Sequence, residues 1–387
     1  MKTAKRMARL GTETAFEVLA KARALEAQGR DIIHLEIGEP DFDTPRNIID
    51  AAIKALNDGY THYTPSAGFI QLRQTIAEYI SKTRNIDVGP ENVVVVPGGK
   101  PIIFFSILAL CEEGDEVIYP NPGYPIYESM INFVGATPVP IRLRMEKNFS
   151  FDIDEFRSLI SPRTKMIVIN SPQNPTGGIL TREDLEAIAE VAIENDIMVL
   201  SDEIYSRIIY DGEFQSIASL PGMKEHTILL DGFSKTYAMT GWRLGYGVMP
   251  EWLAEHITRL MTNSNSCAAA FTQIAGIEAL TGPQDEVDKM VQAFRERRDL
   301  IVERLNKIPG FKCLKPSGAF YVFPNIEGTG MKSKEMADYL LYEGGVAVLP
   351  GTSFGEYGEG FIRLSYANSL ENISKALDRI EEVISRL

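Results

Sequence analysis

The feature that most constrains the fold is a repeated alternation between short, β-rich apolar runs and amphipathic helical patterns. The apolar runs include residues 93–96, 116–119, 166–170, 197–200, 227–230 and 244–249. Helical patterns lie between them, for example at residues 182–195, which open with the capping pair Thr181 and Asp184. Strands that alternate with helices predict a mostly parallel sheet with helices on both faces. We therefore expect an α/β fold.

A change of pattern near residue 284 predicts a second, smaller α+β unit. A long charged helix is expected at residues 286–307, and a hairpin-like piece at residues 318–324. A helix expected at residues 12–28 is assigned to the same unit. With 387 residues the chain is long enough for two domains. The predicted division is a large domain at 44–283 and a small domain built from both chain ends, 1–43 plus 284–387.

Charge and hydropathy restrict the partners of the chain. The 53 acidic and 39 basic side chains give a formal net charge of −14, which argues against binding to nucleic acid. The longest apolar run, residues 101–111, is far shorter than the ~20 residues of a membrane span. The basic first residues contain no apolar segment of the length that a signal peptide needs. We expect no membrane partner and a cytoplasmic location.

Cysteine and histidine usage gives no sign of a metal site. The three cysteines (Cys111, Cys267 and Cys313) lack metal-site spacing and favour a reducing compartment. The four histidines are scattered and form no H-x-x-x-H pair. Residues 351–355 match the G-x-S-x-G pattern of α/β-hydrolases, but every histidine precedes Ser353, whereas that fold needs one after it. We expect neither a metal centre nor a hydrolase.

The residues after each apolar run are candidates for chemistry, because open α/β sheets bind ligands beyond the carboxyl ends of their strands. Residues 97–101, Pro-Gly-Gly-Lys-Pro, follow the first run and precede a helical pattern. A glycine turn that opens a helix can bind an anion through free backbone N–H groups. The spacing of a nucleotide-triphosphate loop is absent. An ordinary strand-to-helix turn fits these residues equally well.

Three later strand ends carry an amide, a carboxylate and an amine. Asn174 lies in a turn after residues 166–170, Asp202 follows residues 197–200, and Lys235 follows residues 227–230. Asp202 either meets a partner or caps the next helix. Lys235 is either a surface lysine or a partly desolvated nucleophile. With the phenol of Tyr205 and the glycine turn, the set matches the needs of pyridoxal phosphate.

A family resemblance makes this interpretation specific. Residues 232–245, which contain Gly-Phe-Ser-Lys and Gly-Trp-Arg-Leu-Gly, resemble the pyridoxal-phosphate attachment motif of class I aminotransferases. Supporting motifs follow the order of that family: residues 37–42, 63–68, 174–177, 201–205 and 363–367. The chain is most similar to the aspartate-aminotransferase-like branch. The resemblance implies a fold type I structure, pyridoxal phosphate as cofactor, and a homodimer with shared active sites.

The resemblance implies a cofactor role for each matching residue. Lys235 would form the Schiff base and then move the substrate proton, while Asp202 would pair with the pyridine nitrogen. Tyr205 and Asn174 would bind the phenolic oxygen, and Tyr124 would stack on the ring. The implied phosphate ligands are the backbone at Gly99 and Lys100, the side chains of Ser234 and Arg243, and Tyr63 from the neighbouring subunit. Gly232 stands where relatives often carry a further hydroxyl group.

The resemblance also implies how the substrate is held. Arg363 would bind the α-carboxylate as a planar fork, with the backbone of Gly38 at the same carboxylate. Tyr124 and Asn174 would also contact the substrate. Lys100 would meet a distal carboxylate, which favours aspartate, glutamate and 2-oxoglutarate; the alternative for Lys100 is a solvated lysine at a helix start.

We therefore expect a pyridoxal-phosphate-dependent aminotransferase that works by ping-pong exchange between an L-amino acid and a 2-oxo acid. The alternatives are an aminotransferase for aromatic amino acids or alanine, and a carbon–sulfur lyase on the same fold. A related type of transcription regulator carries an added DNA-binding segment. The motifs here begin by Gly38, and the net charge is unfavourable for DNA.

Overall fold

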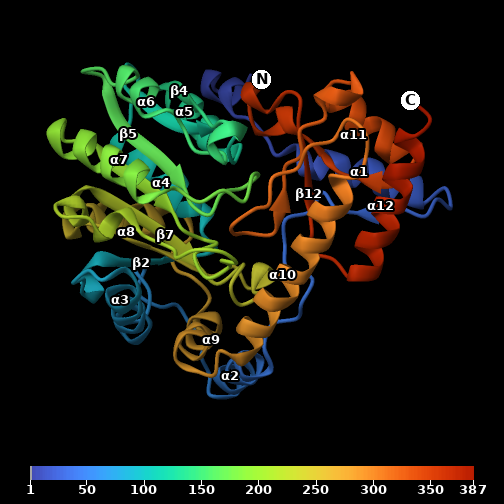
Figure 1. Ribbon diagram of the computed structural model, residues 1–387. Helices are drawn as coiled ribbons and strands as arrows, with labels where there is room; N and C mark the ends of the chain where they lie inside the picture. Colours follow the sequence, from blue (N-terminus) through green and yellow to red (C-terminus); the bar gives the residue numbers. More distant parts are fainter. Residues whose placement is uncertain (1) are drawn as a thin grey trace.

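The computed structural model describes residues 2–387 and contains a seven-stranded sheet, which lies on the left in Figure 1. The strand order is β2-β8-β7-β6-β5-β3-β4. The strands are β2 (Val93–Val96), β3 (Glu116–Asn121), β4 (Thr137–Arg142), β5 (Thr164–Asn170), β6 (Met198–Asp202), β7 (Thr227–Gly232) and β8 (Gly245–Val248). All neighbouring strands are parallel except the two pairs that involve β8. The expected mostly parallel sheet is confirmed.

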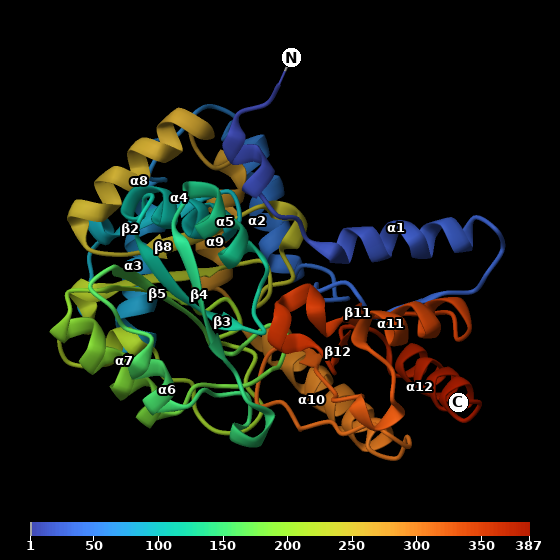
Figure 2. The same cartoon turned by 90° about the horizontal axis from the view of Figure 1, so that it is seen from above.

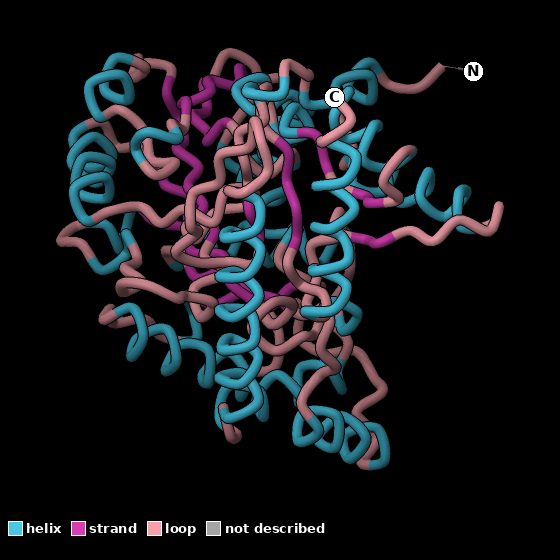
Figure 3. Tube along the Cα trace, turned by 45° about the vertical axis from the view of Figure 1, so that its right-hand side comes forward, coloured by secondary structure: helices cyan, strands magenta, loops and turns pink. Residues whose placement is uncertain are grey.

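Helices cover both faces of the sheet, and Figure 3 shows the strands enclosed by them. One face packs against α4 (Lys100–Leu110), α5 (Ile126–Val134) and α8 (Glu251–Ser264). The other face is covered by two groups. At one end lie α6 (Ile153–Ser158) and α7 (Arg182–Glu194); at the other lie α2 (Arg46–Asn57), α3 (Ile70–Arg84) and α9 (Ala270–Thr281). Because both faces are covered, even the edge strand β2 is a continuous apolar run of four buried valines.

A second group of elements stands beside the sheet, coloured orange and red in Figure 1. Its helices are α10 (Asp285–Leu305), α11 (Ser333–Tyr342) and α12 (Leu370–Ile384). Its antiparallel sheet has the order β11 (Leu349–Pro350), β12 (Ile362–Ser365) and β9 (Tyr321–Val322).

Both ends of the chain contribute to this group. The strand β1 (Ile33–His34) pairs in parallel with β10 (Val346–Ala347). The helix α1 (Thr14–Glu26) packs Ala22 and Leu25 against Leu341, and Figure 2 shows α1 beside α11. The α1 helix expected at residues 12–28 is therefore present, shorter by two residues at each end.

The connections contain short 3₁₀ helices: η1 (Lys5–Arg9), η2 (Pro90–Asn92), η3 (Met145–Lys147), η4 (Ile217–Ser219), η5 (Met223–His226), η6 (Thr240–Trp242), η7 (Glu327–Thr329), η8 (Gly351–Phe354) and η9 (Glu356–Gly358). The expected capping box of α7 is present. The backbone N–H of Asp184 donates to Thr181 Oγ1 at 3.2 Å, and the N–H of Thr181 donates to Asp184 Oδ2 at 2.8 Å. Within residues 2–387, no helix combines the length and apolar character that crossing a membrane requires.

The hairpin expected at residues 318–324 was wrong. Only residues 321–322 form a strand there, and this strand pairs with β12 more than forty residues later instead of turning back on itself. Ala319 has a positive φ of 57°, and Gly318 bridges to Ile209 of the preceding group. The apolar residues of this segment are buried between the two groups, so burial rather than a local turn decides their pairing.

Candidate active site

A cleft of about 950 Å³ lies beyond the carboxyl ends of the parallel strands, between the sheet and the second group. Its walls include residues that follow β2, β5, β6 and β7, together with Arg363 of β12 and the start of α1. Every residue predicted for the site lines this cleft except Tyr63. Strand ends that are far apart in sequence are brought together because parallel strands end at one edge of the sheet.

Lys235 lies in the turn that follows β7, and its amine faces the cleft. Its Nζ donates a hydrogen bond to the backbone carbonyl of Gly38 and lies 5.8 Å from the centre of the Phe320 ring. Burial lowers the pKa of Lys235 to about 8. A lysine with this pKa is partly unprotonated near neutral pH, so it can act as a nucleophile or take a proton.

Asp202 is the last residue of β6 and is buried. Its Oδ2 accepts a hydrogen bond from the Tyr127 hydroxyl at 2.7 Å, and its Oδ1 accepts one from the backbone N–H of Ile204 at 3.2 Å. Burial raises the pKa of Asp202 to about 6, against the opposing effect of the Tyr127 hydrogen bond. This buried carboxylate closes a sheet strand rather than capping a helix, and it suits a cationic N–H group in the cleft.

Arg363 of β12 and Asn174, in the turn after β5, meet across the cleft. Arg363 Nη1 donates to Asn174 Oδ1 at 3.0 Å, and Nη2 donates to the backbone carbonyl of Glu36. Arg363 Nε is buried without a hydrogen-bond partner, and among residues 2–387 no carboxylate forms an ion pair with this arginine. Burial lowers its pKa. A buried guanidinium without a carboxylate partner is unfavourable, so this end of the cleft is suited to an anion.

The hydroxyl groups of Tyr205 and Tyr321 lie 2.8 Å apart and share a hydrogen bond. Burial raises the pKa of Tyr205 well above its ordinary value. The Tyr321 hydroxyl also explains the glycine at position 38, because a Cβ there would lie 2.3 Å from that oxygen. The Tyr321 ring covers the Arg363 guanidinium at 4.5 Å. Sequence reasoning missed Tyr321, which lies within an ordinary apolar run.

The start of α4 and Arg243 form a cradle at the end of the cleft where an anion can bind. Gly98 has a φ of +78°, and a Cβ on it would lie 2.2 Å from Arg243 Nη2. Arg243 donates to the Thr240 carbonyl at 2.9 Å, which orients its guanidinium. Ser234 lines the same cleft. Backbone N–H groups at the first turn of α4, a hydroxyl and a guanidinium are the donors that a phosphate group requires.

Lys100 and Tyr124 both contact Glu13, a residue that sequence reasoning did not single out. Lys100 Nζ forms an ion pair with Glu13 Oε1, and the Tyr124 hydroxyl donates to the same oxygen at 3.1 Å. The Tyr124 ring meets the Tyr127 ring edge-on, with 5.7 Å between centres. Glu13 and Tyr127 carry no sequence motif. Their place in the site follows from contacts between distant parts of the chain.

Tyr63 is not part of the cleft in this single chain. It lies in the loop between α2 and α3 and is 90% exposed. The residue after Tyr63, Thr64, donates its backbone N–H to Cys267 Sγ at 3.4 Å. The Tyr63 side chain is thus available at the surface, outside the cleft that gathers the other predicted residues.

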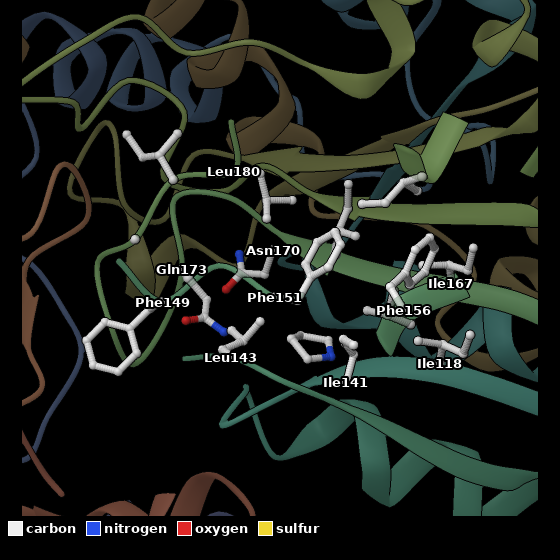
Figure 4. A pocket seen from close by; sticks show the side chains of 16 residues that line it. Ile118, Ile141, Leu143, Phe149, Phe151, Phe156, Ile167, Asn170, Gln173 and Leu180 are labelled. Atoms are coloured by element: carbon white, nitrogen blue, oxygen red, sulfur yellow. The ribbon is translucent and has the colours of Figure 1, made fainter. Parts of the chain in front are cut away.

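A second cavity lies between the sheet and α6 and α7, beneath the turn that carries Asn174 (Figure 4). Its walls are mainly apolar side chains, among them Ile118, Phe156 and Ile167. It holds about 20 Å³, which is room for one water molecule and not for a substrate. Residues 2–387 contain no group of three or more His, Cys, Asp or Glu side chains that could hold a metal ion.

Comparisons with known proteins identify the family and the fold. A family model described as "Aminotransferase class I and II" matches residues 30–380. An aspartate aminotransferase of Pyrococcus horikoshii is 45% identical over 95% of this chain and 93% of its own length. An aromatic-amino-acid aminotransferase of Thermococcus litoralis is 42% identical over 92% of this chain and 93% of its own. The structure of Thermus thermophilus aspartate aminotransferase with maleate has a TM-score of 0.95 and 39% identity, and covers 99% of this chain and 100% of its own.

Proposed function

The chain belongs to the class I and II aminotransferase family, and from this premise we propose that it exchanges amino groups between acidic amino acids and 2-oxo acids. It is a pyridoxal-phosphate-dependent aminotransferase with the fold of that family. The proposed donors are aspartate and glutamate, and the proposed acceptor is an oxo acid such as 2-oxoglutarate. The two half-reactions would follow each other in a ping-pong order.

One observation carries the proposal most directly: Arg363 is a buried cation whose Nε has no partner. A substrate α-carboxylate would supply the missing negative charge, and the flat guanidinium can hold it with two parallel hydrogen bonds. Asn174 and the Glu36 carbonyl fix the guanidinium from the other side. Lys100 is a further cation in the same cleft, which supports a distal carboxylate on the substrate.

The cleft also fits the cofactor. Asp202 would face the ring nitrogen, Tyr205 and Asn174 the phenolic oxygen, and Tyr124 the ring face. The phosphate would be held by the first turn of α4 at Gly99 and Lys100, by Ser234 and by Arg243. When bound, pyridoxal phosphate supplies an electron-withdrawing ring that accepts the electron pair left on the substrate carbon after proton loss.

Lys235 would move the proton. With a pKa of about 8, its amine can take a proton from the substrate Cα at neutral pH and would deliver it to the C4′ carbon of the cofactor. The Gly38 carbonyl, which accepts a hydrogen bond from this amine, restricts where Nζ lies.

We also propose that two copies of the chain form a dimer with shared active sites. The 90% exposed Tyr63 would reach the phosphate in the partner subunit, which is supported by its position outside its own cleft. The proposed division into domains is 44–283 and 1–43 plus 284–387. Three cysteines without a disulfide among them support the proposed cytoplasmic location.

The test of the proposed substrates is spectral. The holoenzyme is mixed with single amino acids in the absence of any oxo acid, and conversion of the cofactor to its amine form is followed by absorbance. We expect conversion by aspartate and glutamate at lower concentrations than by alanine or phenylalanine. Conversion by neutral amino acids alone would refute the acidic substrate class and favour the aromatic or alanine alternative, while leaving the aminotransferase assignment intact.

A further inference from the structure

Glu13 places a carboxylate of the protein itself inside the cleft. It is the residue immediately before α1, its side chain is only 17% exposed, and it lines the cleft beside Phe16. Its Oε1 forms the ion pair with Lys100 and accepts the hydrogen bond from Tyr124 at 3.1 Å. The Glu13 carboxylate therefore occupies Lys100, the residue that would bind the distal carboxylate of the substrate in the proposed function.

The other carboxylates at the mouth of the cleft have partners elsewhere. Glu26 lies 3.1 Å from His34 Nε2, Glu39 accepts a hydrogen bond from Thr240 at 2.9 Å, and Asp41 pairs with Arg297 at 2.6 Å. Glu13 alone among these contacts Lys100, within the part of the chain that the structure describes. The pairing is therefore specific to one carboxylate rather than a general feature of an acidic surface.

A substrate carboxylate and the Glu13 carboxylate cannot both approach Lys100 at no cost. Two like charges within a few ångströms repel each other, and the enclosed cleft weakens the screening by water. An acidic substrate must therefore displace Glu13 from the lysine. A substrate with an uncharged side chain leaves the Glu13–Lys100 pair in place, so that Lys100 is never left without a counter-ion.

Few contacts oppose the displacement of Glu13. The side chain makes no capping hydrogen bond to α1, residues 2–12 are exposed, and α1 itself buries only Ala22 and Leu25, which lie in its second half. The Lys100 side chain is 46% exposed, so the ion pair is partly solvated. The exposure of the lysine weakens its attraction to Glu13, so a substrate carboxylate can take the place of Glu13 at Lys100.

We propose that Glu13 is a specificity-determining residue: its carboxylate is an internal competitor that occupies Lys100 until an acidic substrate displaces it. This inference rests on the proposed function, because it requires Lys100 to bind a distal carboxylate. In this proposal Lys100 stays paired with Glu13 when a neutral substrate is bound, and it pairs with the distal carboxylate when a dicarboxylate is bound. Glu13 thereby lowers the preference of the enzyme for acidic substrates without contacting the α-carboxylate.

The inference is tested with maleate, an unreactive dicarboxylate, by calorimetric titration of the holoenzyme. In Glu13→Gln the amide cannot form the ion pair, and we expect maleate to bind at least about fivefold more tightly than to wild type. The ratio of kcat/KM for aspartate to that for alanine should rise by a similar factor. Glu17→Gln is the matched control, because it removes the same charge from an exposed position on α1 that does not line the cleft, and it should leave both values unchanged.

Lys100→Met separates the inference from the proposed function. If Lys100→Met weakens maleate binding while Glu13→Gln binds maleate as wild type does, Lys100 is the dicarboxylate ligand and the role of Glu13 is wrong. If Lys100→Met leaves maleate binding unchanged, Lys100 does not bind the distal carboxylate and the inference about Glu13 is wrong. Equal thermal unfolding temperatures of the variants and wild type exclude misfolding as the cause of either result.

Discussion

The Tyr127 hydroxyl and Asp202 Oδ2 lie 2.7 Å apart, with the hydroxyl donating to the carboxylate. Tyr127 is fully buried on α5, so the hydrogen bond lies where water does not compete. The bond fixes the carboxylate at the end of β6 and favours its ionised form against the opposing effect of burial. An ionised, fixed carboxylate is what the proposed contact with the cofactor ring nitrogen requires.

Replacing Tyr127 with phenylalanine should therefore weaken cofactor binding. Because one hydrogen bond to a charged group is lost, the Kd of pyridoxal phosphate for the apoenzyme should rise about tenfold. The Kd is measured by fluorescence titration. Tyr339→Phe is the control, because it removes a hydroxyl that donates to the Val383 carbonyl on α12, away from the cleft. Equal cofactor affinity in Tyr127→Phe and Tyr339→Phe would show that the Tyr127 hydroxyl does not support the cofactor.

Asp202 should make the stability of the apoenzyme depend on pH. Its pKa is raised from 3.8 to about 6 by burial, so between these values the folded chain binds more protons than the unfolded chain. The contribution of protonated Asp202 to the free energy of unfolding is therefore present at pH 4 and is lost as the pH rises through 6. Relative to Asp202→Asn, wild-type apoenzyme should lose about 3 kcal/mol of unfolding free energy over that range in urea titrations. A constant difference between the two proteins would contradict the raised pKa.

Arg84 at the end of α3 holds two buried carboxylates behind the site. Its Nε lies 2.8 Å from Glu203, and its Nη2 lies 2.9 Å from Asp231. Burial opposes the charge of Arg84, but the attraction of the two acids raises its pKa. Removing the arginine leaves both acids unpaired, so Arg84→Met should cost about 3–5 kcal/mol of unfolding free energy.

The control for this prediction is an exposed ion pair. Arg182→Met breaks the pair with Glu186 on the surface of α7 and should cost less than about 0.5 kcal/mol. Both variants are compared with wild type by urea unfolding. Similar small losses in Arg84→Met and Arg182→Met would show that the buried cluster contributes no more than a surface pair.

Arg363→Lys tests the α-carboxylate contact. Lysine keeps the charge but loses the planar fork, so kcat/KM for aspartate should fall roughly 10- to 100-fold. The same fall is expected for alanine, because both donors share the α-carboxylate. Arg304→Lys, at the surface between α10 and α12, should leave both values unchanged. A loss confined to aspartate would instead place Arg363 at the distal carboxylate.

The sheet and the strand-end residues could be predicted from the sequence because short local patterns of apolar residues determine them. Strands buried on both faces are continuous apolar runs, and the residues that end the parallel strands lie at one edge of the sheet. Lys235 and Asp202 were located in this way. The edge strand β4 was missed, because it is partly exposed and contains Pro138 and Pro140, so its sequence lacks an apolar run.

The parts that sequence reasoning missed depend on contacts between distant segments. Tyr127 and Tyr321 are ordinary buried aromatic residues until the fold brings Asp202 and Tyr205 to their hydroxyl groups. Glu13 precedes an exposed helix and has no motif, yet it reaches Lys100, which is 87 residues away in the sequence. Such long-range pairings are set by how the two groups of elements pack, and no local pattern records them.

The central role proposed for Lys235 is tested most directly by finding which lysine bonds the cofactor. The holoenzyme is reduced with borohydride, which makes a lysine–cofactor linkage permanent, and is then digested and mapped by mass spectrometry. We expect the cofactor mass on Lys235 alone, and we expect Lys235→Ala to carry none and to have lost transaminase turnover. Cofactor on another lysine such as Lys100, or full turnover in Lys235→Ala, would contradict it.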